Sequence, residues 1–166
     1  MKQLTEGLGE FNAVVSPDGK WVYYNAFTET RLKVERVSAD GGQATTIEGP
    51  TGFTIYAISP DGNTLLGNAW DDAARRSSLA QLPVEGGTPK LLNLPVAGVP
   101  SWAPAGKTIS YVDFVDDQAV LMARDPDCGA SRTLHSFGSN RLFGFAWSHD
   151  GRKIAFGRAR FQVTLC

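Results

Sequence analysis

Few residues in this 166-residue chain are of a type and spacing that could carry catalysis or bind a metal. Its two histidines, His135 and His149, have no histidine or cysteine partner at the spacing of a zinc site. The chain contains no Gly-x-Ser-x-Gly nucleophile elbow and neither of the common glycine-rich phosphate-binding loops. We therefore expect no catalytic residue, no metal site and no cofactor, and we expect both histidines to be exposed structural residues.

Three carboxylates, Asp18, Asp61 and Asp150, recur at a regular interval and could form an acidic ring that binds a cation. A ring of turns is too wide for a single ion, and an aspartate followed by glycine is typical of a turn. We therefore expect these carboxylates to cap turns. The two cysteines, Cys128 and Cys166, are too few for a disulfide framework, so we expect free thiols and leave their pairing open.

Charged side chains gather in three short segments that could instead contact a protein partner. The first segment is mixed in charge, the second is acidic and the third is basic, so together they could complement a partner electrostatically. Phe27, Trp70 and Phe114 border such segments and would supply apolar anchors, unless they pack between sheets. A solvated surface without a partner is the alternative interpretation. The predicted partner-binding rim comprises Trp70, Asp71, Asp72, Arg75, Arg76, Asp116, Asp117, Arg158 and Arg160.

An internal repeat indicates which elements must position these side chains. Four turn segments begin 43, 44 and 45 positions apart, and all four contain the same glycine. Proline presets the backbone angle φ, aspartate caps the turn and glycine accepts a positive φ, so each segment predicts a tight turn. Apolar and polar residues alternate on both sides, which is typical of strands with one face more buried. The segments are Ser16–Gly19, Ser59–Gly62, Ala103–Gly106 and Ser148–Gly151.

Each repeat predicts four antiparallel strands, which is the size of one β-propeller blade. For residues 68–82, which lack glycine and proline, a helix is the alternative. We expect strands at 11–16, 20–27, 32–38 and 43–48, at 53–59, 63–70, 78–84 and 88–93, at 98–103, 107–114, 119–125 and 130–136, and at 142–148, 152–158 and 161–165. The expected boundaries are 1–7 for the last strand of a preceding or closing blade, 8–49, 50–94 and 95–138 for three blades, and 139–166 for a partial fourth.

The repeat resembles that of TolB-type β-propellers, which are relatives of WD-repeat proteins. The resemblance rests on an apolar residue followed by Ser-Pro-Asp-Gly-Lys, a β-rich run and then Asp-Gly-Gly, and it covers essentially all of the chain. It implies an all-β propeller of four-stranded antiparallel blades. Ala105 and His149 depart from the pattern, which puts in doubt a functional ring of turn carboxylates. Residues 145–156 are most similar to the carboxy-terminal propeller regions of bacterial Ser/Thr kinases and winged-helix regulators.

The two ends of the chain leave the closure of the propeller open. Residues 2–6 match the outer strand at 44–48, and the fourth repeat lacks that strand, so the amino-terminal segment could complete the final blade. Closure within one chain would give a four-bladed ring. Two chains could form an eight-bladed ring, or the chain could be part of a larger propeller. We favour the last two arrangements over a closed monomer.

Composition and charge exclude some classes of partner. Sixteen basic and 17 acidic residues leave a net charge of −1, which provides no footprint for nucleic acid or an anionic membrane. No apolar run reaches the length of a membrane span, so we expect no membrane insertion. No signal peptide is visible, which favours the cytoplasm if Met1 is the native start, whereas a fragment could come from a periplasmic protein.

The expected function is therefore a non-catalytic propeller scaffold that binds a protein or peptide. The resemblance implies a sensing or docking region of a larger bacterial signalling or envelope protein. One alternative is the gating propeller of a prolyl-oligopeptidase-like serine peptidase, whose catalytic domain would need a nucleophile elbow. The other is a small-ligand site in the central channel, for which Gly52, Phe53, Asn140 and Arg141 are candidates by position.

Overall fold

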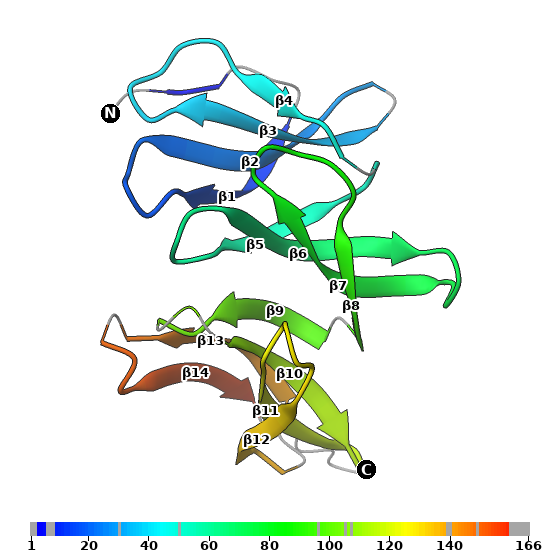
Figure 1. Ribbon diagram of the computed structural model, residues 1–166. Helices are drawn as coiled ribbons and strands as arrows, with labels where there is room; N and C mark the ends of the chain where they lie inside the picture. Colours follow the sequence, from blue (N-terminus) through cyan, green and yellow to red (C-terminus); the bar gives the residue numbers. More distant parts are fainter. Residues whose placement is uncertain are drawn as a thin grey trace, which may run out of the picture. The chain divides into compact units, whose positions relative to one another are not determined.

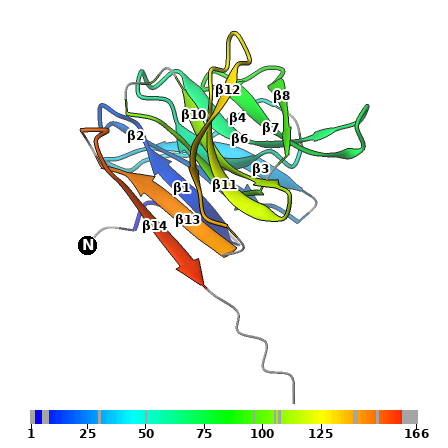
Figure 2. The same cartoon turned by 90° about the horizontal axis from the view of Figure 1, so that it is seen from below.

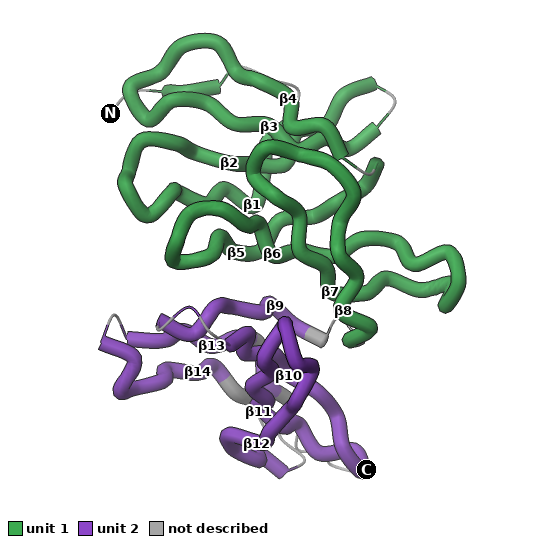
Figure 3. Tube along the Cα trace, in the orientation of Figure 1, with its two compact units in different colours: residues 1–95 green, residues 96–166 purple. Residues whose placement is uncertain are grey.

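The computed structural model contains only β-strands as regular secondary structure among the residues it describes. Those residues divide into two compact units, residues 1–95 and residues 96–166 (Figure 3). No helix of the described residues is long and apolar enough to cross a membrane. The structure describes residues 3–5, 9–29, 31–49, 51–95, 97–104, 106, 108–138, 141–148 and 150–159.

Unit 1 consists of two four-stranded antiparallel sheets (Figure 1). In both sheets the spatial order of the strands follows the order along the chain, so each strand pairs with its sequence neighbour. Such a meander matches the short Gly-containing turns of the sequence. The first sheet comprises β1 (Glu10–Val15), β2 (Trp21–Phe27), β3 (Leu32–Ser38) and β4 (Thr45–Ile47), and the second comprises β5 (Thr54–Ile58), β6 (Thr64–Asp71), β7 (Arg76–Pro83) and β8 (Lys90–Pro95).

The two sheets of unit 1 pack face to face on a shared core. Tyr23 and Val34 of the first sheet meet Phe53, Ile55 and Leu65 beside or on the second. Each of these side chains is at most 4% exposed. Burying one such side chain stabilises the fold by about 1.5–3 kcal/mol, which is why alternate strand positions are apolar. Gly67 is required in β6, because a Cβ there would collide with the Thr54 carbonyl oxygen of the paired strand and lie 2.6 Å from the Phe53 ring.

The described residues of unit 2 repeat this construction with one four-stranded and one two-stranded sheet. Leu121 and Phe137 of the first sheet region pack against Leu142, Phe145 and Ile154 of the second. Figure 2 shows β13 and β14 lying side by side as an antiparallel pair. The expected strand at 161–165 lies outside the described residues. The strands are β9 (Ala97–Trp102), β10 (Ile109–Val115), β11 (Gln118–Arg124), β12 (Ser131–Ser136), β13 (Arg141–Trp147) and β14 (Ile154–Ala159).

The first strand of every sheet has an irregular register with the second strand. In β1 the shift falls between Phe11 and Val14, and in β5 it falls between Ile55 and Ala57. The pairings β9–β10 and β13–β14 carry the same irregularity. A bulge bends a strand and increases its twist, so the repeat encodes a bent first strand as well as turns.

The repeated aspartates cap turns, as expected. Ser59 Oγ donates a hydrogen bond to Asp61 Oδ1 at 2.5 Å, and the same oxygen accepts one from the Asn63 amide at 3.0 Å. Ser59 Oγ also accepts from the Thr64 amide at 2.9 Å, which joins the turn to the next strand. These hydrogen bonds lower the pKa of the Asp61 carboxyl from its usual value. The Ser16 and Ser148 turns contain the same arrangement.

The helical alternative for residues 68–82 is wrong. These residues form the end of β6, a turn and most of β7, with Trp70 paired to Ser77 and Asp71 paired to Arg76. The backbone can turn here without glycine because Arg75 adopts a positive φ of 49°. The propeller repeat therefore outweighs the helical preference of a Gly- and Pro-free stretch.

The amino-terminal segment packs on unit 1. Leu4 contacts a cluster formed by Tyr24, Ala26 and Val37 on one face of the first sheet. Ile47 of β4, which follows Leu4 by 43 residues, packs into the core between the two sheets of the unit. Leu4 therefore packs against a face of the first sheet, in the way that Ile47 of the first sheet packs against a face of the second sheet. The assignment of residues 2–6 to an outer strand stays a prediction, because only residues 3–5 are described.

Candidate functional site

Three connections gather at one end of the sheets of unit 1. The β2–β3 turn is closed by the Thr28 amide, which donates to the Arg31 carbonyl at 2.9 Å. The connection from β4 to β5 lies beside it, because the Gly52 amide donates to the Leu32 carbonyl at 3.4 Å. The β6–β7 hairpin extends further than the β2–β3 hairpin at this end (Figures 1 and 2). We call this end of unit 1 the hairpin end.

Large aromatic side chains are exposed at the same repeat position in three sheets. Phe27, Trp70 and Phe114 each stand eight residues after the turn glycine, near the end of the second strand of their sheet. Their exposed fractions are 54%, 57% and 55%. The interpretation that they are packed between sheets is therefore excluded. Phe27 stacks on Phe11, with the ring centroids 5.1 Å apart, so its ring is held in place by a neighbour.

The charged residues of the β6–β7 hairpin divide into two roles. Asp71 is only 6% exposed, and its Oδ1 accepts a hydrogen bond from the Ala74 amide at 3.0 Å. That bond closes the loop from inside, so Asp71 shapes the hairpin. Asp72, Arg75 and Arg76 are exposed and free to meet solvent or a partner. The hairpin thus presents one acidic and two basic side chains next to the exposed Trp70.

In unit 2 the β10–β11 connection is a tight two-residue turn. Asp116 and Asp117 form it with positive φ values of 49° and 59°, the backbone shape that favours aspartate or asparagine. Both side chains are exposed. Arg158 lies in β14, where only its backbone is described, and Arg160 lies outside the described residues. The basic segment of the predicted rim therefore has no described side chain.

The other sequence candidates have no site around them in the described residues. His135 is exposed in β12 and contacts Phe137 edge to face at 4.6 Å. No group of three or more potential metal-ligating side chains occurs in the part of the chain that the structure describes. Cys128 is an exposed free thiol, whereas Cys166 and His149 lie outside the described residues.

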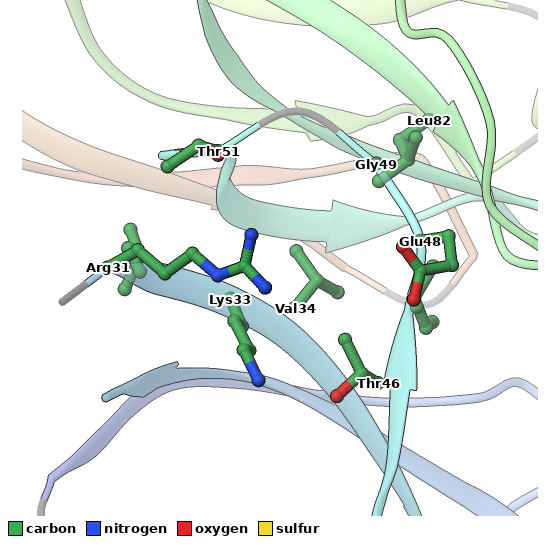
Figure 4. Close-up of a pocket in the computed structure, with 10 residues that line it drawn as sticks. Arg31, Lys33, Val34, Thr46, Glu48, Gly49, Thr51 and Leu82 are labelled. Carbon is green, nitrogen blue, oxygen red and sulfur yellow. The ribbon is translucent and has the colours of Figure 1, made fainter. Parts of the chain in front are cut away.

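A small cavity of about 100 Å³ opens at the outer part of the hairpin end. Figure 4 shows the Arg31 guanidinium on one side of it and the Glu48 carboxylate on the other, with Thr51 above Arg31. Val34 and Leu82 supply apolar lining. Pockets for drug-sized ligands measure about 300–1,000 Å³, so this cavity suits at most a single side chain or a few water molecules.

The placement of Phe53 in a ligand-binding channel is wrong. Phe53 is 1% exposed and belongs to the core between the sheets of unit 1. Gly52 is exposed at the hairpin end with a φ of 82°. Asn140 lies outside the described residues, and only the backbone of Arg141 is described. Phe53 directly precedes β5, and its ring is buried by side chains of the neighbouring sheet. The sequence around Phe53 does not reveal this burial.

Asn25 joins the two sheets of unit 1, and the sequence analysis did not identify it. Asn25 is fully buried on β2, and its Nδ2 donates to the Phe53 carbonyl at 2.8 Å. Its Oδ1 accepts from the Ile55 amide, also at 2.8 Å. The amide side chain thereby pairs with the backbone of the next sheet as another strand would. The only available signal was a polar residue inside an otherwise apolar strand.

Known proteins resemble the chain along most of its length. No protein-family model matches it. A protein of Agrobacterium fabrum, described as uncharacterized protein Atu1656, is 32% identical over 154 residues, which cover 87% of this chain and 49% of that protein. The structure of a putative TolB from Agrobacterium tumefaciens has a TM-score of 0.71 at 30% identity, over 87% of this chain and 52% of that one.

Two further solved structures share the architecture. TolB from Acinetobacter baumannii has a TM-score of 0.75 at 20% identity, over 89% of this chain and 37% of that one. The β-propeller domain of the Trilobed protease from Pyrococcus furiosus has a TM-score of 0.60 at 15% identity, over 85% and 46%. The chain spans about half the length of the Agrobacterium relative that it matches. The repeated four-stranded sheets and these similarities show that the chain has a TolB-like β-propeller fold.

Proposed function

We propose that the chain is a non-catalytic propeller platform that binds a protein or peptide through its exposed hairpins. The observation that carries this proposal is the exposure of an aromatic side chain at one repeat position in three sheets. Aromatic residues beside arginine are typical of the few side chains that dominate binding energy at interfaces. Propellers hold such hairpins on a stiff scaffold, so the side chains lose little freedom on binding.

The β6–β7 hairpin is the centre of the proposed surface. Trp70 supplies an apolar anchor, and Arg75 and Arg76 supply charge beside it. The bond from Ala74 to Asp71 holds the loop in one shape before a partner arrives. The acidic Asp116–Asp117 turn of unit 2 offers the opposite charge, and we propose it as a separate contact for a partner with basic side chains. Arg158 and Arg160 are included in the proposed surface on the basis of the sequence alone.

We further propose that the chain acts as a docking or sensing region of a larger bacterial signalling or envelope protein. Support comes from the similarity to TolB structures and from the relative that is about twice as long. The second candidate is the gating propeller of a serine peptidase, which the similarity to the Trilobed protease propeller favours. A nucleophile elbow encoded beside this chain would decide for the peptidase.

A peptide selection tests the binding surface. We would select a displayed random-peptide library on the whole chain and measure the affinity of enriched peptides for the wild type, Trp70→Ala and Lys20→Ala. Trp70→Ala should weaken binding at least tenfold, since a buried interface tryptophan contributes about 2 kcal/mol or more. Lys20 is exposed in a turn at the opposite end of its sheet, so Lys20→Ala should bind like the wild type.

The same selection can contradict the proposal. Enriched peptides that bind Trp70→Ala and a Phe114→Ala variant as tightly as the wild type would move the site away from the hairpins. A library that yields no binder at all would speak against a peptide-binding platform. Hydrolysis of an enriched peptide by the purified chain would contradict the non-catalytic assignment.

A further inference from the structure

Unit 2 contains a cavity of about 270 Å³ at the end of its sheets opposite the β10–β11 turn. It lies between the β9–β10 turn, with Pro104, and the β13–β14 turn, with Gly151. Its walls include Leu134 and Trp147, and the side chains of Arg132 and Asp150 provide one positive and one negative charge. It is therefore separate from the hairpins to which binding was assigned above.

Two large side chains fill the corresponding place in unit 1. In unit 1 the second residue after the turn glycine is Trp21, and the guanidinium of Arg36 lies 5.1 Å from the centroid of its ring. Arg36 also reaches across to the neighbouring sheet, where it forms an ion pair with Glu85 at 3.1 Å. An indole covered by a guanidinium thus occupies the junction between the sheets of unit 1.

The same two positions in unit 2 carry small residues. Thr108 stands where the repeat has Trp21, and Ala123, paired with Ser110, stands where Arg36 is paired with Tyr23. Both Thr108 and Ala123 line the cavity. The cavity is therefore the space left when an indole and a guanidinium are removed from the junction.

The positive charge is retained from another strand. Arg132 of β12 pairs with Ala123 across the strands, and it lines the cavity in which no Trp21 equivalent is present. None of the ion pairs among the described residues involves Arg132. A cation beside an apolar space attracts the face of an aromatic ring. The junction of unit 2 thus has a guanidinium, that of Arg132, but has no indole at the position of Trp21.

The wall opposite is fixed in position. Trp147 Nε1 donates a hydrogen bond to Ser110 Oγ at 3.2 Å, so the indole is held by β10 of the neighbouring sheet. Pro104 lies close to Gly151, where a Cβ would be 3.5 Å from the proline ring. Rigid apolar walls favour binding because little is ordered when a ligand enters.

We propose that this cavity binds a small planar aromatic molecule of about the size of an indole. Such a molecule would replace the missing Trp21 equivalent, lie against Trp147 and Leu134, and place its face near the Arg132 guanidinium. The size is adequate, since an apolar cavity of about 150 Å³ already accommodates benzene. The charge is adequate as well, because the guanidinium needs no counter-ion to attract a ring face.

Titration with 3-methylindole, which is the tryptophan side chain ending at Cβ, tests the proposal on the whole chain. The indole N–H resonance of Trp147, assigned by its loss in Trp147→Phe, should shift with a Kd of about 0.1–1 mM, as ligand efficiency predicts for so small a molecule. Benzyl alcohol should bind more tightly than cyclohexylmethanol, because the two differ only in the aromatic face.

Two variants locate the site. Thr108→Trp combined with Ala123→Arg restores the filling of unit 1 and should weaken 3-methylindole at least tenfold. Arg132→Gln removes only the exposed cation, leaves folding intact and should weaken binding about twofold to fivefold. The first variant blocks the space and the second changes its charge, so a folding defect in the first leaves the second informative.

Several results would overturn the proposal. One is a Trp147 resonance that does not move at about ten times the expected Kd. Another is equal binding by the wild type and Arg132→Gln, and a third is equal binding of benzyl alcohol and cyclohexylmethanol. Binding of the capped tripeptide Gly-Trp-Gly without binding of 3-methylindole would assign the cavity to a partner's side chain and reject a free aromatic molecule.

Discussion

The junction between the sheets of unit 1 and the junction between the sheets of unit 2 have the same backbone and different contents. At the sixth residue after the turn glycine, unit 1 has Asn25 and unit 2 has Val112, and both are buried. Asn25 joins two sheets by hydrogen bonds to Phe53 and Ile55. Val112 can contribute only apolar contact at that position. At this position the first junction is thus held by polar bonds and the second by apolar packing.

At a second pair of positions the large and small side chains lie on opposite sides of the junction in the two units. In unit 1 a large Tyr23 on β2 is matched by Ile58 on β5, whereas unit 2 has the small Ser110 on β10 and the large Trp147 on β13. Trp147 then donates to the hydroxyl that the small residue provides. Large and small side chains have changed sides while the turn and register stayed the same. The repeat therefore dictates the backbone, and each junction is packed by its own set of side chains.

The largest expected effect comes from removing the polar junction of unit 1. Asn25→Ala leaves the Phe53 carbonyl and the Ile55 amide buried without a partner, which should lower the free energy of unfolding by about 3 kcal/mol. Val112→Ala removes two methyl groups from the corresponding place and should cost about 2 kcal/mol. Urea unfolding measures both changes, and hydrogen exchange at the Ile55 amide localises the first.

Gln43→Ala is the control for this pair, because Gln43 is an exposed amide whose loss should change stability by less than about 0.5 kcal/mol. A smaller cost for Asn25→Ala than for Val112→Ala would contradict the polar description of the first junction. Unchanged exchange at Ile55 would do so directly.

A smaller effect is expected from the stacked pair that fills the outer part of the first junction. Trp21 is 37% exposed, so Trp21→Ala should cost about 2 kcal/mol, less than the loss of a fully buried tryptophan. Arg36→Ala should cost about 1 kcal/mol, and the two changes together should cost about 0.5–1 kcal/mol less than their sum, since the ring and the guanidinium stabilise each other.

A double-mutant cycle in urea measures this coupling. The matched change in unit 2, Thr108→Ala, should cost less than about 0.5 kcal/mol, since Thr108 borders a space that is already open. Strict additivity of the Trp21 and Arg36 changes would show that the ring and the cation do not support each other. It would also weaken the physical basis for an aromatic molecule beside Arg132.

The repeated backbone could be predicted from the sequence because its signals are local. The segment Ser59–Thr64 contains all the groups that close its own turn, and its spacing from the turn at Ser16–Gly19 places the strands between them. The exposure of Trp70 could not be predicted in this way. It depends on how far the β6–β7 hairpin extends, and the sequence alone left packing between sheets open.

The side chains that fill the junctions between sheets were still harder to predict from the sequence. Asn25 bonds to backbone atoms 28 and 30 residues further along the chain, and no local pattern distinguishes such an asparagine from an exposed one. The cavity of unit 2 has a clearer signal. Aligning the first and third repeats places Thr108 and Ala123 opposite Trp21 and Arg36, and two small residues in place of two large ones at neighbouring positions predict a space. That inference needs the pairing register, which only the structure supplies.

The smallest expected effect concerns the turn aspartates. The turn at Ala103–Gly106 has no such aspartate, because Ala105 stands in its place and Ala103 stands in place of the serine. The pKa of Asp61 is lowered from its model-compound value of 3.8 by the Ser59 hydroxyl and the Asn63 amide, so the unfolded chain binds a proton more readily than the folded one. Its contribution to stability is therefore complete above pH 4 and is lost as the pH falls through the folded pKa. Asp61→Asn should cost about 0.5–1 kcal/mol at pH 6, because solvent screens this exposed group.

Urea midpoints at pH 6 and pH 3 check the sign of this effect. The difference between the two midpoints should be smaller for Asp61→Asn than for the wild type, because the variant has no carboxylate to protonate there. Asp72→Asn is the control, since Asp72 is an exposed carboxylate of the β6–β7 hairpin, in which Asp71 accepts the turn bond from the Ala74 amide. If both variants keep the full wild-type difference, the turn bonds seen at Ser59 do not contribute to acid sensitivity, and the turn without serine is then equivalent to the others in stability as well as in shape.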